Sequence, residues 1–401
     1  MMEVTPVAPS EFDRLGKRAL IVGVAGLALS ALWAIFNAEQ FFRSYLLAYV
    51  FWIGIVLGCF AILMVQHMSG GAWGLVIRRV LEAATRTFLP MAALFIPLAI
   101  GVMLKFIYVW ANPEAAAGNA TLAALLKHKE PYLNVPFFLA RVVFYFVVWI
   151  GVTHFLNKWS LDQDRTGDRR ITRKMQVLSG PGLVLYGLTV TFASIDWVMS
   201  LEPEWFSTIF GILFMGGQGV AAMAFIIAVM VLLNKRKPFS EIIAPRHFHD
   251  LGKLLLAFIM LWAYFNFSQF LIIWSGNLPE EIPWYIRRLQ GPFKWIGLIL
   301  VIFHFALPFL MLLSRNLKRD GRRLAALAIA VIIFRLVDVY WLIAPEFHHG
   351  QFHLHLLDIL APIGLGGVWL WLFFQQLKKR PLLPVGDPEL EGAIGPGEGH
   401  H

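Results

Sequence analysis

Ten long apolar segments constrain the fold of this chain more than any other feature of its sequence. Each has at least eighteen residues and almost no charge, so as a helix rising about 1.5 Å per residue it can cross a hydrocarbon core of about 30 Å. The segments cover residues 19–36, 46–65, 88–110, 137–156, 179–199, 207–233, 254–274, 294–313, 324–344 and 356–377. Because 58% of the 401 residues are hydrophobic and only 15% are charged, one soluble core could not hide so much apolar surface.

Helices are the predicted form of these segments. Inside lipid every backbone polar group must be paired within the protein, which leaves α-helices and closed β-barrels, and the two-residue alternation of a barrel is missing. The sequence therefore predicts an all-α polytopic membrane protein of about ten transmembrane helices. A cleaved signal peptide is the alternative for residues 19–36, which follow Arg14, Lys17 and Arg18, but this apolar run leads straight into the second segment.

The distribution of basic residues predicts the orientation in the membrane. Of the 34 lysines and arginines, 25 fall on the side of the N-terminus, six on the opposite side and three within the segments. By the positive-inside rule this asymmetry places both termini in the cytoplasm. The net charge of +9 then faces anionic lipid, and we infer no nucleic-acid partner from it.

Cysteine and histidine usage limits the cofactors that the chain can hold. The single cysteine, Cys59, is too few for disulfides, Cys-ligated iron–sulfur clusters or covalent c-type haem. Only His304 lies near the centre of a segment, whereas bis-His haem needs two axial histidines at matched depth. Other histidines share an outer loop with Glu346 at irregular spacing, so we expect interfacial residues and no metal site; they are His348, His349, His353 and His355.

An internal duplication is visible in the motifs at the segment ends. Asp196 and Asp338 are each followed, after six residues, by Pro-Glu and an aromatic residue. Asn-Pro-Glu at 112–114 corresponds to Asn-Leu-Pro-Glu at 277–280, and Pro-Phe opens the segments at 136–137 and 292–293. Arginine-rich loops with an adjacent Gly and Asp follow at 165–170 and 319–323. Four matches in the same order indicate two copies of one four-helix unit in parallel orientation.

The duplication predicts four regions. Residues 1–41 form a cytoplasmic N-terminus and a peripheral first helix, and residues 42–206 form a first four-helix bundle from helices two to five. Residues 207–350 form a second bundle from helices six to nine, and residues 351–401 a peripheral tenth helix and a cytoplasmic tail.

Ionisable and polar groups inside the segments are the candidate functional residues. A charge at mid-bilayer costs about 3 kcal/mol or more, so it persists only with a partner or a purpose. With the predicted topology eight such groups fall in the outer half and one near the middle, whereas the inner half is nearly free of them apart from His154. Structural ion pairs and snorkelling side chains are the alternative to proton handling. The candidate proton-handling residues are Lys105, Arg141, Tyr145, Asp196, His304, Arg335, Asp338, His355 and Asp358.

Local spacing groups these candidates further. Arg335 and Asp338 are three residues apart, as are His355 and Asp358, and Arg141 and Tyr145 are four apart, so each pair shares one helix face. The repeated Asp196 and Asp338 are the strongest candidates, because duplicated carboxylates at one depth indicate a proton-handling role.

A resemblance to a known family rests on two stretches and on the helix layout. These are Asn277-Leu278-Pro279-Glu280-Glu281-Ile282-Pro283-Trp284-Tyr285-Ile286-Arg287-Arg288 and Ser194-Ile195-Asp196-Trp197. With its ten segments, the chain resembles the ActF-type membrane subunits of bacterial alternative complex III, in the wider NrfD or polysulfide-reductase group. The resemblance covers nearly the whole chain beyond its first ten or so residues.

The resemblance implies an accessory subunit of a respiratory or photosynthetic quinol:electron-acceptor oxidoreductase in the bacterial cytoplasmic (inner) membrane. Its implied partners are membrane lipid, a longer NrfD-like sister subunit (ActC), multihaem and monohaem cytochrome c subunits and an iron–sulfur subunit. The implied quinol, such as menaquinol, has its better supported pocket in the sister subunit, and a contribution of this subunit to quinol binding is the alternative. Anchoring the complex and offering a proton path are the expected tasks of this subunit.

A proton-coupled secondary transporter is the alternative class, since transporters also combine internal repeats with intramembrane charges. No segment is visibly broken in mid-membrane by Gly and Pro at equivalent positions of the two halves, which favours the oxidoreductase subunit.

Overall fold

The computed structural model describes residues 9–112, 114, 118–235, 239–347 and 351–394. Its described residues form helices and connecting turns, with no β-strand among them. The elements in chain order are α1 (Pro9–Trp33), α2 (Ala38–Ser69), α3 (Ala72–Thr85), α4 (Phe88–Leu94), α5 (Ile96–Met103), η1 (Val109–Ala111), α6 (Ala120–Lys129), α7 (Val135–Thr166), α8 (Arg169–Trp197), η3 (Met199–Leu201), α9 (Phe210–Asn234), α10 (Phe239–Ile242), α11 (Pro245–Gly276), α12 (Ile282–Leu289), α13 (Phe293–Ile299), η4 (Leu300–Ala306), α14 (Leu307–Leu313), α15 (Arg315–Arg319), α16 (Gly321–Phe347), α17 (Leu357–Leu377) and α18 (Leu390–Ile394).

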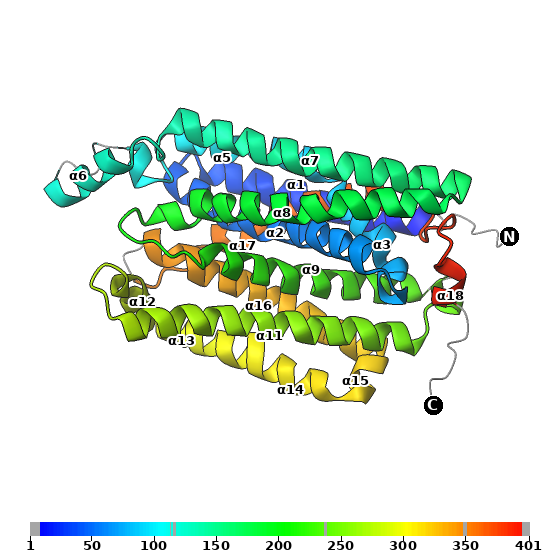
Figure 1. Ribbon diagram of the computed structural model, residues 1–401. Coiled ribbons are helices and arrows are strands. Elements are labelled where there is room, and N and C mark those ends of the chain that lie inside the picture. The colour runs from blue at the N-terminus through cyan, green and yellow to red at the C-terminus, as the bar shows by residue number, and fades with distance from the viewer. Residues whose placement is uncertain (1–8, 113, 115–117, 236–238, 348–350, 395–401) are drawn as a thin grey trace.

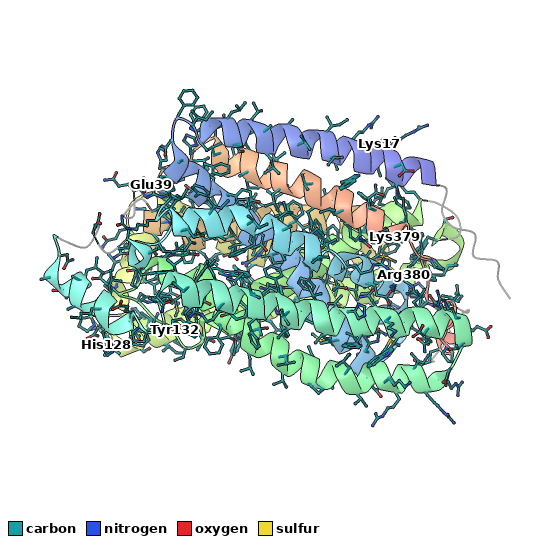
Figure 2. All side chains as sticks on the ribbon, turned by 90° about the horizontal axis from the view of Figure 1, so that it is seen from above. Lys17, Glu39, His128, Tyr132, Lys379 and Arg380 are labelled. Carbon is teal, nitrogen blue, oxygen red and sulfur yellow. The ribbon has the colours of Figure 1, made fainter. Side chains whose placement is uncertain are left out.

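Ten helical spans in the described part of the chain are long and apolar enough to cross a membrane. The prediction of an all-α, multi-pass membrane fold is therefore confirmed. The spans run side by side in Figure 1, with the start of α1 and the end of α17 at one end and α6 and α12 at the other. We call these ends the terminal face and the far face. Figure 2 labels Lys17, Lys379 and Arg380 toward the terminal face, and His128 and Tyr132 toward the far face.

The third span differs from its predicted limits. The sequence predicted residues 88–110, whereas the span begins sixteen residues earlier, at Ala72, and ends at Met103. Its first helix, α3, carries Arg78, Arg79 and Glu82, which read as loop residues in the sequence but are all buried. They can lie inside the protein because each is paired with an opposite charge.

Helix contacts follow the duplication. In the first bundle α2 packs against α3 and α8, and α7 packs against α8. In the second bundle α9 packs against α11 and α16, and the span α13–η4–α14 packs against both α11 and α16. The bundles meet where α2 contacts α9, where α8 contacts α9 and where α16 contacts α2. In the last two contacts, the last long helix of each bundle packs against the first helix of the other bundle.

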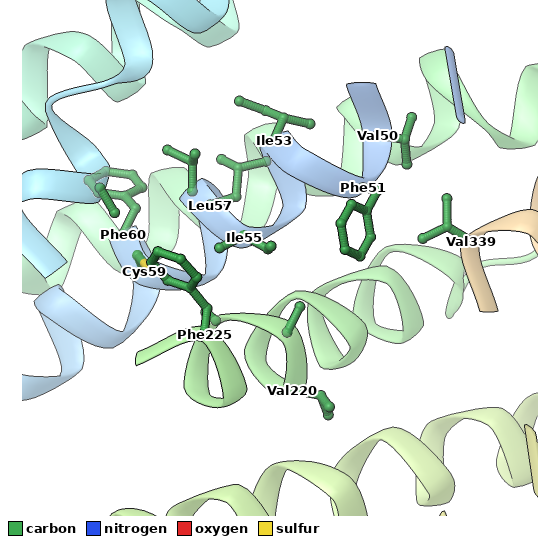
Figure 3. Packing of buried hydrophobic residues seen from close by; sticks show 14 of the residues in the cluster. Val50, Phe51, Ile53, Ile55, Leu57, Cys59, Phe60, Val220, Phe225 and Val339 are labelled. Carbon is green, nitrogen blue, oxygen red and sulfur yellow. The ribbon is translucent and has the colours of Figure 1, made fainter. Parts of the chain in front are cut away.

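The centre of the molecule lies between the first helix of each copy. In the apolar stretch of eighteen residues that marks each span, 89% of the residues of α2 and 83% of those of α9 are buried inside the protein. The corresponding share is 22% in α1, in α11 and in the eighth span. Figure 3 shows Phe51, Leu57 and Phe60 of α2 in this core beside Val220 and Phe225 of α9. A helix that is apolar all round needs such a surrounding of other helices. The peripheral helices α1 and α17 pack on each other and against α2.

Repeated caps fix corresponding turns at the terminal face. The Asp168 carboxylate accepts from the Arg170 N–H at 2.8 Å to start α8, and Asp320 accepts from the Arg322 N–H at 3.0 Å to start α16. Gly167 ends α7 with φ of 65°, a left-handed conformation that favours glycine. The similar arginine-rich loops therefore share a capping function.

Candidate functional site

The first bundle buries Asp196 at the far-face end of α8. Arg141 of α7 binds this carboxylate with two hydrogen bonds, Nε to Oδ2 and Nη2 to Oδ1, both 2.9 Å long. The Tyr145 hydroxyl donates to Oδ2 at 2.6 Å. Asp196 is completely buried, so the arginine compensates a charge that would otherwise be strongly unfavourable there. The predicted Arg141–Tyr145 face is thus directed at one carboxylate.

Aromatic and backbone groups hold Arg141 in place. Its Nη1 donates to the backbone oxygen of Tyr132 at 2.9 Å, and its guanidinium carbon lies 3.9 Å from the Tyr132 ring centroid and 4.4 Å from that of Phe137. Asn134 fixes the start of α7, because its side chain accepts from the Phe137 N–H at 2.9 Å. These contacts fix the position of the arginine beside Asp196.

The second bundle buries Asp338 in α16. Its Oδ2 accepts from Arg335 Nη1 one turn earlier and from Trp262 Nε1 of α11 at 2.9 Å. The Arg335 guanidinium lies directly against the backbone of Gly217 in α9, where an added Cβ would come 2.2 Å from its central carbon. The predicted Arg335–Asp338 pair is present, and both residues belong to α16. Asp196, in contrast, is paired with an arginine of a neighbouring helix. The equivalent aspartates therefore have different surroundings.

His304 lies beside this second pair in a π-helical segment, η4. Its ring packs edge-on against Trp262, with centroids 4.6 Å apart, and both ring nitrogens are buried without a hydrogen-bond partner. π-Helical segments occur often at functional sites. Two orphaned ring nitrogens next to a buried ion pair are groups that a water molecule could satisfy.

Asp358, His355 and Lys105 lie apart from these two clusters. Asp358 accepts from the Ser44 hydroxyl at 2.6 Å and from the backbone N–H of His355 at 2.9 Å, so it joins α17 to α2 and caps its own helix. His355 thus contacts Asp358 through its backbone N–H rather than through its imidazole ring. Lys105 was predicted inside a helix, but it is exposed in the turn after α5, with φ of 65°.

A buried cluster on the terminal face was not predicted. Glu82 of α3 accepts from Arg79 at 2.6 Å, from the Ser160 hydroxyl at 2.5 Å and from Arg380 at 3.1 Å. Arg79 also pairs with Asp164 near the end of α7. The expectation that the inner half of the helices is nearly free of ionisable groups is therefore wrong. The signal that could have revealed the cluster is the spacing of Arg78, Arg79 and Glu82 on one face of a helix.

The two ends of the first bundle are connected by the buried face of α7, which we call the α7 polar face. Its members recur every three or four residues and are all buried; they are Arg141, Tyr145, Trp149, Thr153, Asn157 and Ser160. This spacing keeps them on one side of a helix of 3.6 residues per turn.

Contacts along the α7 polar face form one group near Asp196 and another near Glu82. The Tyr145 and Trp149 rings stack with centroids 6.0 Å apart, and Trp149 Nε1 donates to the Thr189 hydroxyl at 2.9 Å. Asn157 Nδ2 approaches the Thr85 hydroxyl at 3.4 Å. The buried Thr153 hydroxyl has no hydrogen-bond partner, but it lines a cavity of about 370 Å³ together with Asn157. The wall of this cavity is mostly apolar, and its few polar groups, Thr153 and Asn157 among them, are where water could be held.

Another charged cluster joins the two bundles at the far face. Arg287 of α12 bridges Glu202, at 2.7 Å, and Glu346 of α16, at 3.0 Å. The fully buried Arg288 donates to Glu346 at 2.7 Å and lies 3.6 Å from the Trp284 ring centroid. Burial, together with the neighbouring Glu346 carboxylate, raises the pKa of Glu202 to about 8, against the lowering effect of Arg287.

Metal binding finds no support in the described part of the chain, where no group of three His, Cys, Asp or Glu side chains is arranged to hold an ion. His348 and His349 lie outside the described residues. The His353 and His355 rings lie 6.0 Å apart between centroids.

The fold and these clusters define the class of protein: a multi-pass, all-α membrane protein with two parallel four-helix bundles and buried ion pairs. No protein-family model matches the sequence, and no curated protein matches it.

Proposed function

We propose that this chain is the membrane subunit of a quinol:electron-acceptor oxidoreductase of the alternative complex III type, and that it anchors the complex and carries protons through its first bundle. The sequence resemblance at residues 194–197 and 277–288 supports the choice of complex. The observation that carries the proton path is the α7 polar face, which links buried carboxylates near opposite faces of the molecule.

The chemistry of the α7 polar face fits proton movement better than electron transfer. Carboxylates and hydroxyls both donate and accept protons, so Asp196, Tyr145 and the Thr189 hydroxyl can pass them along. The Trp149 N–H can only donate, so its role is to hold the Thr189 hydroxyl in place. Water in the cavity at Thr153 would complete the path to Glu82.

Quinol oxidation, in this proposal, occurs in the sister subunit and supplies both the electrons and the protons. The electrons leave through haem and iron–sulfur subunits, because the chain has one cysteine, Cys59, buried in α2. Asp338 with His304 gives the second bundle a proton-holding group in the same half of the membrane as Asp196.

Gentle detergent extraction followed by a haem stain tests the assignment. We expect the natural chain to co-purify with c-type cytochromes, and the chain expressed alone to be colourless and to lack quinol oxidation. A chain that purifies alone from its native membrane, without haem proteins, would argue against the complex and for the transporter class.

The interruptions of the spans also separate these two classes. Transporters of the inverted- or parallel-repeat kind carry broken helices at equivalent positions of both halves. In this chain α3, α4 and α5 divide the third span, whereas its counterpart α11 is continuous, and the π-segment η4 has no counterpart in the continuous α7. The interruptions are therefore not paired.

A further inference from the structure

A basic cavity opens on the terminal-face half of the first bundle, outside the Asp196 site. It has a volume of about 370 Å³ and lies between α3, α4, α7 and the segment after α17. Its positively charged members are Arg86, Lys158 and Arg380, and no acidic side chain lines it. Apolar side chains form the rest of its wall, among them Leu89 and Ile150.

Arg86 is the unusual member of this lining. Its Nη2 donates to the backbone oxygen of Gln376 at 2.5 Å, its Nε is buried without a hydrogen-bond partner, and no ion pair holds it. Arg380, by contrast, is paired with Glu82 at 3.1 Å. Arg86 and the exposed Lys158 therefore contribute positive charge to the cavity that no carboxylate of the described chain balances at contact distance.

The apolar wall continues outward from this charge. Leu89 is 68% exposed and Phe155, one turn from Lys158 on α7, is 49% exposed, so both offer apolar surface beside the cavity. A ligand that matches the whole cavity carries an anionic head and a hydrocarbon tail. We propose that the cavity binds one anionic phospholipid, with its phosphodiester on Arg86 and Lys158 and an acyl chain along Leu89 and Ile150.

The position of the cavity agrees with this occupant. Figure 2 shows Arg380, one of its lining residues, at the same end of the molecule as Lys17 and Lys379. Basic pockets between transmembrane helices at the positively charged face of a membrane protein are suited to anionic headgroups, because guanidinium and ammonium groups make strong, charge-assisted hydrogen bonds to phosphate. This is the same cavity that Thr153 lines, but the inference rests on its positive charge and apolar wall and not on the proposed proton path.

Lipid titration of the purified full-length chain tests the site. Short-chain phosphatidylglycerol should raise the melting temperature in detergent more than short-chain phosphatidylcholine does. Lys158→Gln should weaken the apparent phosphatidylglycerol affinity by about tenfold, which corresponds to the loss of one charge-assisted contact. Because Lys158 is exposed, this variant should fold normally; Arg86→Gln should weaken binding at least as much.

Lys17→Gln is the matched control, since it removes an exposed positive charge from the same face without touching the cavity. It should leave the phosphatidylglycerol affinity unchanged. Equal loss in Lys17→Gln and Lys158→Gln would show general surface attraction and overturn the proposal. If inorganic phosphate reproduced the whole effect at the same concentrations, the cavity would be a site for a free anion and not for a lipid.

Discussion

At the scale of single residues, Asp196 shows how a charge is kept inside a membrane protein. Its two oxygens receive two hydrogen bonds from Arg141 and one from Tyr145, so its negative charge is satisfied locally. A structural role and a proton-handling role both use these contacts, and a single substitution would confuse them.

A double variant separates the two roles at this position. Asp196→Asn alone leaves the buried Arg141 charge unpaired, so we expect it to destabilise the protein by about 3–5 kcal/mol. Combining it with Arg141→Gln removes both charges and should restore most of that stability, while proton release during quinol oxidation stays impaired. The measurements are thermal unfolding and proton release by the assembled complex.

Glu39→Gln serves as the control, because Glu39 forms an exposed pair with Arg43 on the far face and should matter little. Full proton release in the stable double variant would remove Asp196 from the path.

The raised pKa of Glu202 predicts that the stability of the folded protein depends on pH. The Glu202 carboxyl keeps a proton up to about pH 8 in the folded protein, whereas its ordinary pKa is 4.5. The folded state therefore binds more protons between these values, so this contribution to stability is complete below about pH 4.5 and is lost as the pH rises through about 8. Melting temperatures from pH 6 to 9 should fall for the natural chain.

Glu202→Gln should flatten this pH profile, since the amide stays neutral throughout. A profile with the same slope in the variant would assign the pH dependence to another group.

At the scale of elements, α7 combines a polar buried face with an apolar exposed face. Thr153 is the member of the polar face whose hydroxyl is buried without a partner in the protein. A buried hydroxyl of this kind costs stability unless water in the neighbouring cavity satisfies it.

Thr153→Val tests whether the α7 polar face carries protons. It keeps the shape of the side chain, so we expect a change in unfolding free energy of less than about 1 kcal/mol, while proton transfer by the reconstituted complex slows. Thr191→Val is the matched control on α8, because the Thr191 hydroxyl donates to the backbone oxygen of Gly187 and lies off the path. Equal transfer rates in the two variants would contradict the proposed path.

At the scale of the whole molecule, the side-by-side spans place the turns of the chain on two opposite faces. The terminal face carries the arginine-rich caps at Asp168 and Asp320, and the far face carries the Glu202–Arg287 cluster. The chain therefore has only two possible orientations in the membrane, with either the terminal face or the far face in the cytoplasm.

Reporter fusions test that choice. A reporter that works only in the cytoplasm should be active when fused near Arg169, Lys235 or Lys318 and inactive near Glu202 or Glu280, because basic loops stay on the cytoplasmic side. Activity near Glu280 would refute the predicted topology, and Lys235 and Glu280, in the connections before and after α11, form the most direct comparison.

The sequence by itself determined the fold class and the approximate spans, and it predicted the duplication. These depend on the length and period of apolar runs and on repeated end motifs, which are local properties of the chain. The proximity of Arg335 to Asp338 is equally local, so the sequence indicated it as well.

Only the tertiary structure decided which charges meet. Arg141 and Asp196 lie on different helices, and Glu82 finds Ser160 and Arg380 from distant parts of the chain. Hydropathy counts Arg79 and Glu82 as unfavourable in lipid, so it shortened the third span, whereas pairing inside the protein removes that penalty. Pairing between helices depends on their packing, which a period along one helix does not encode.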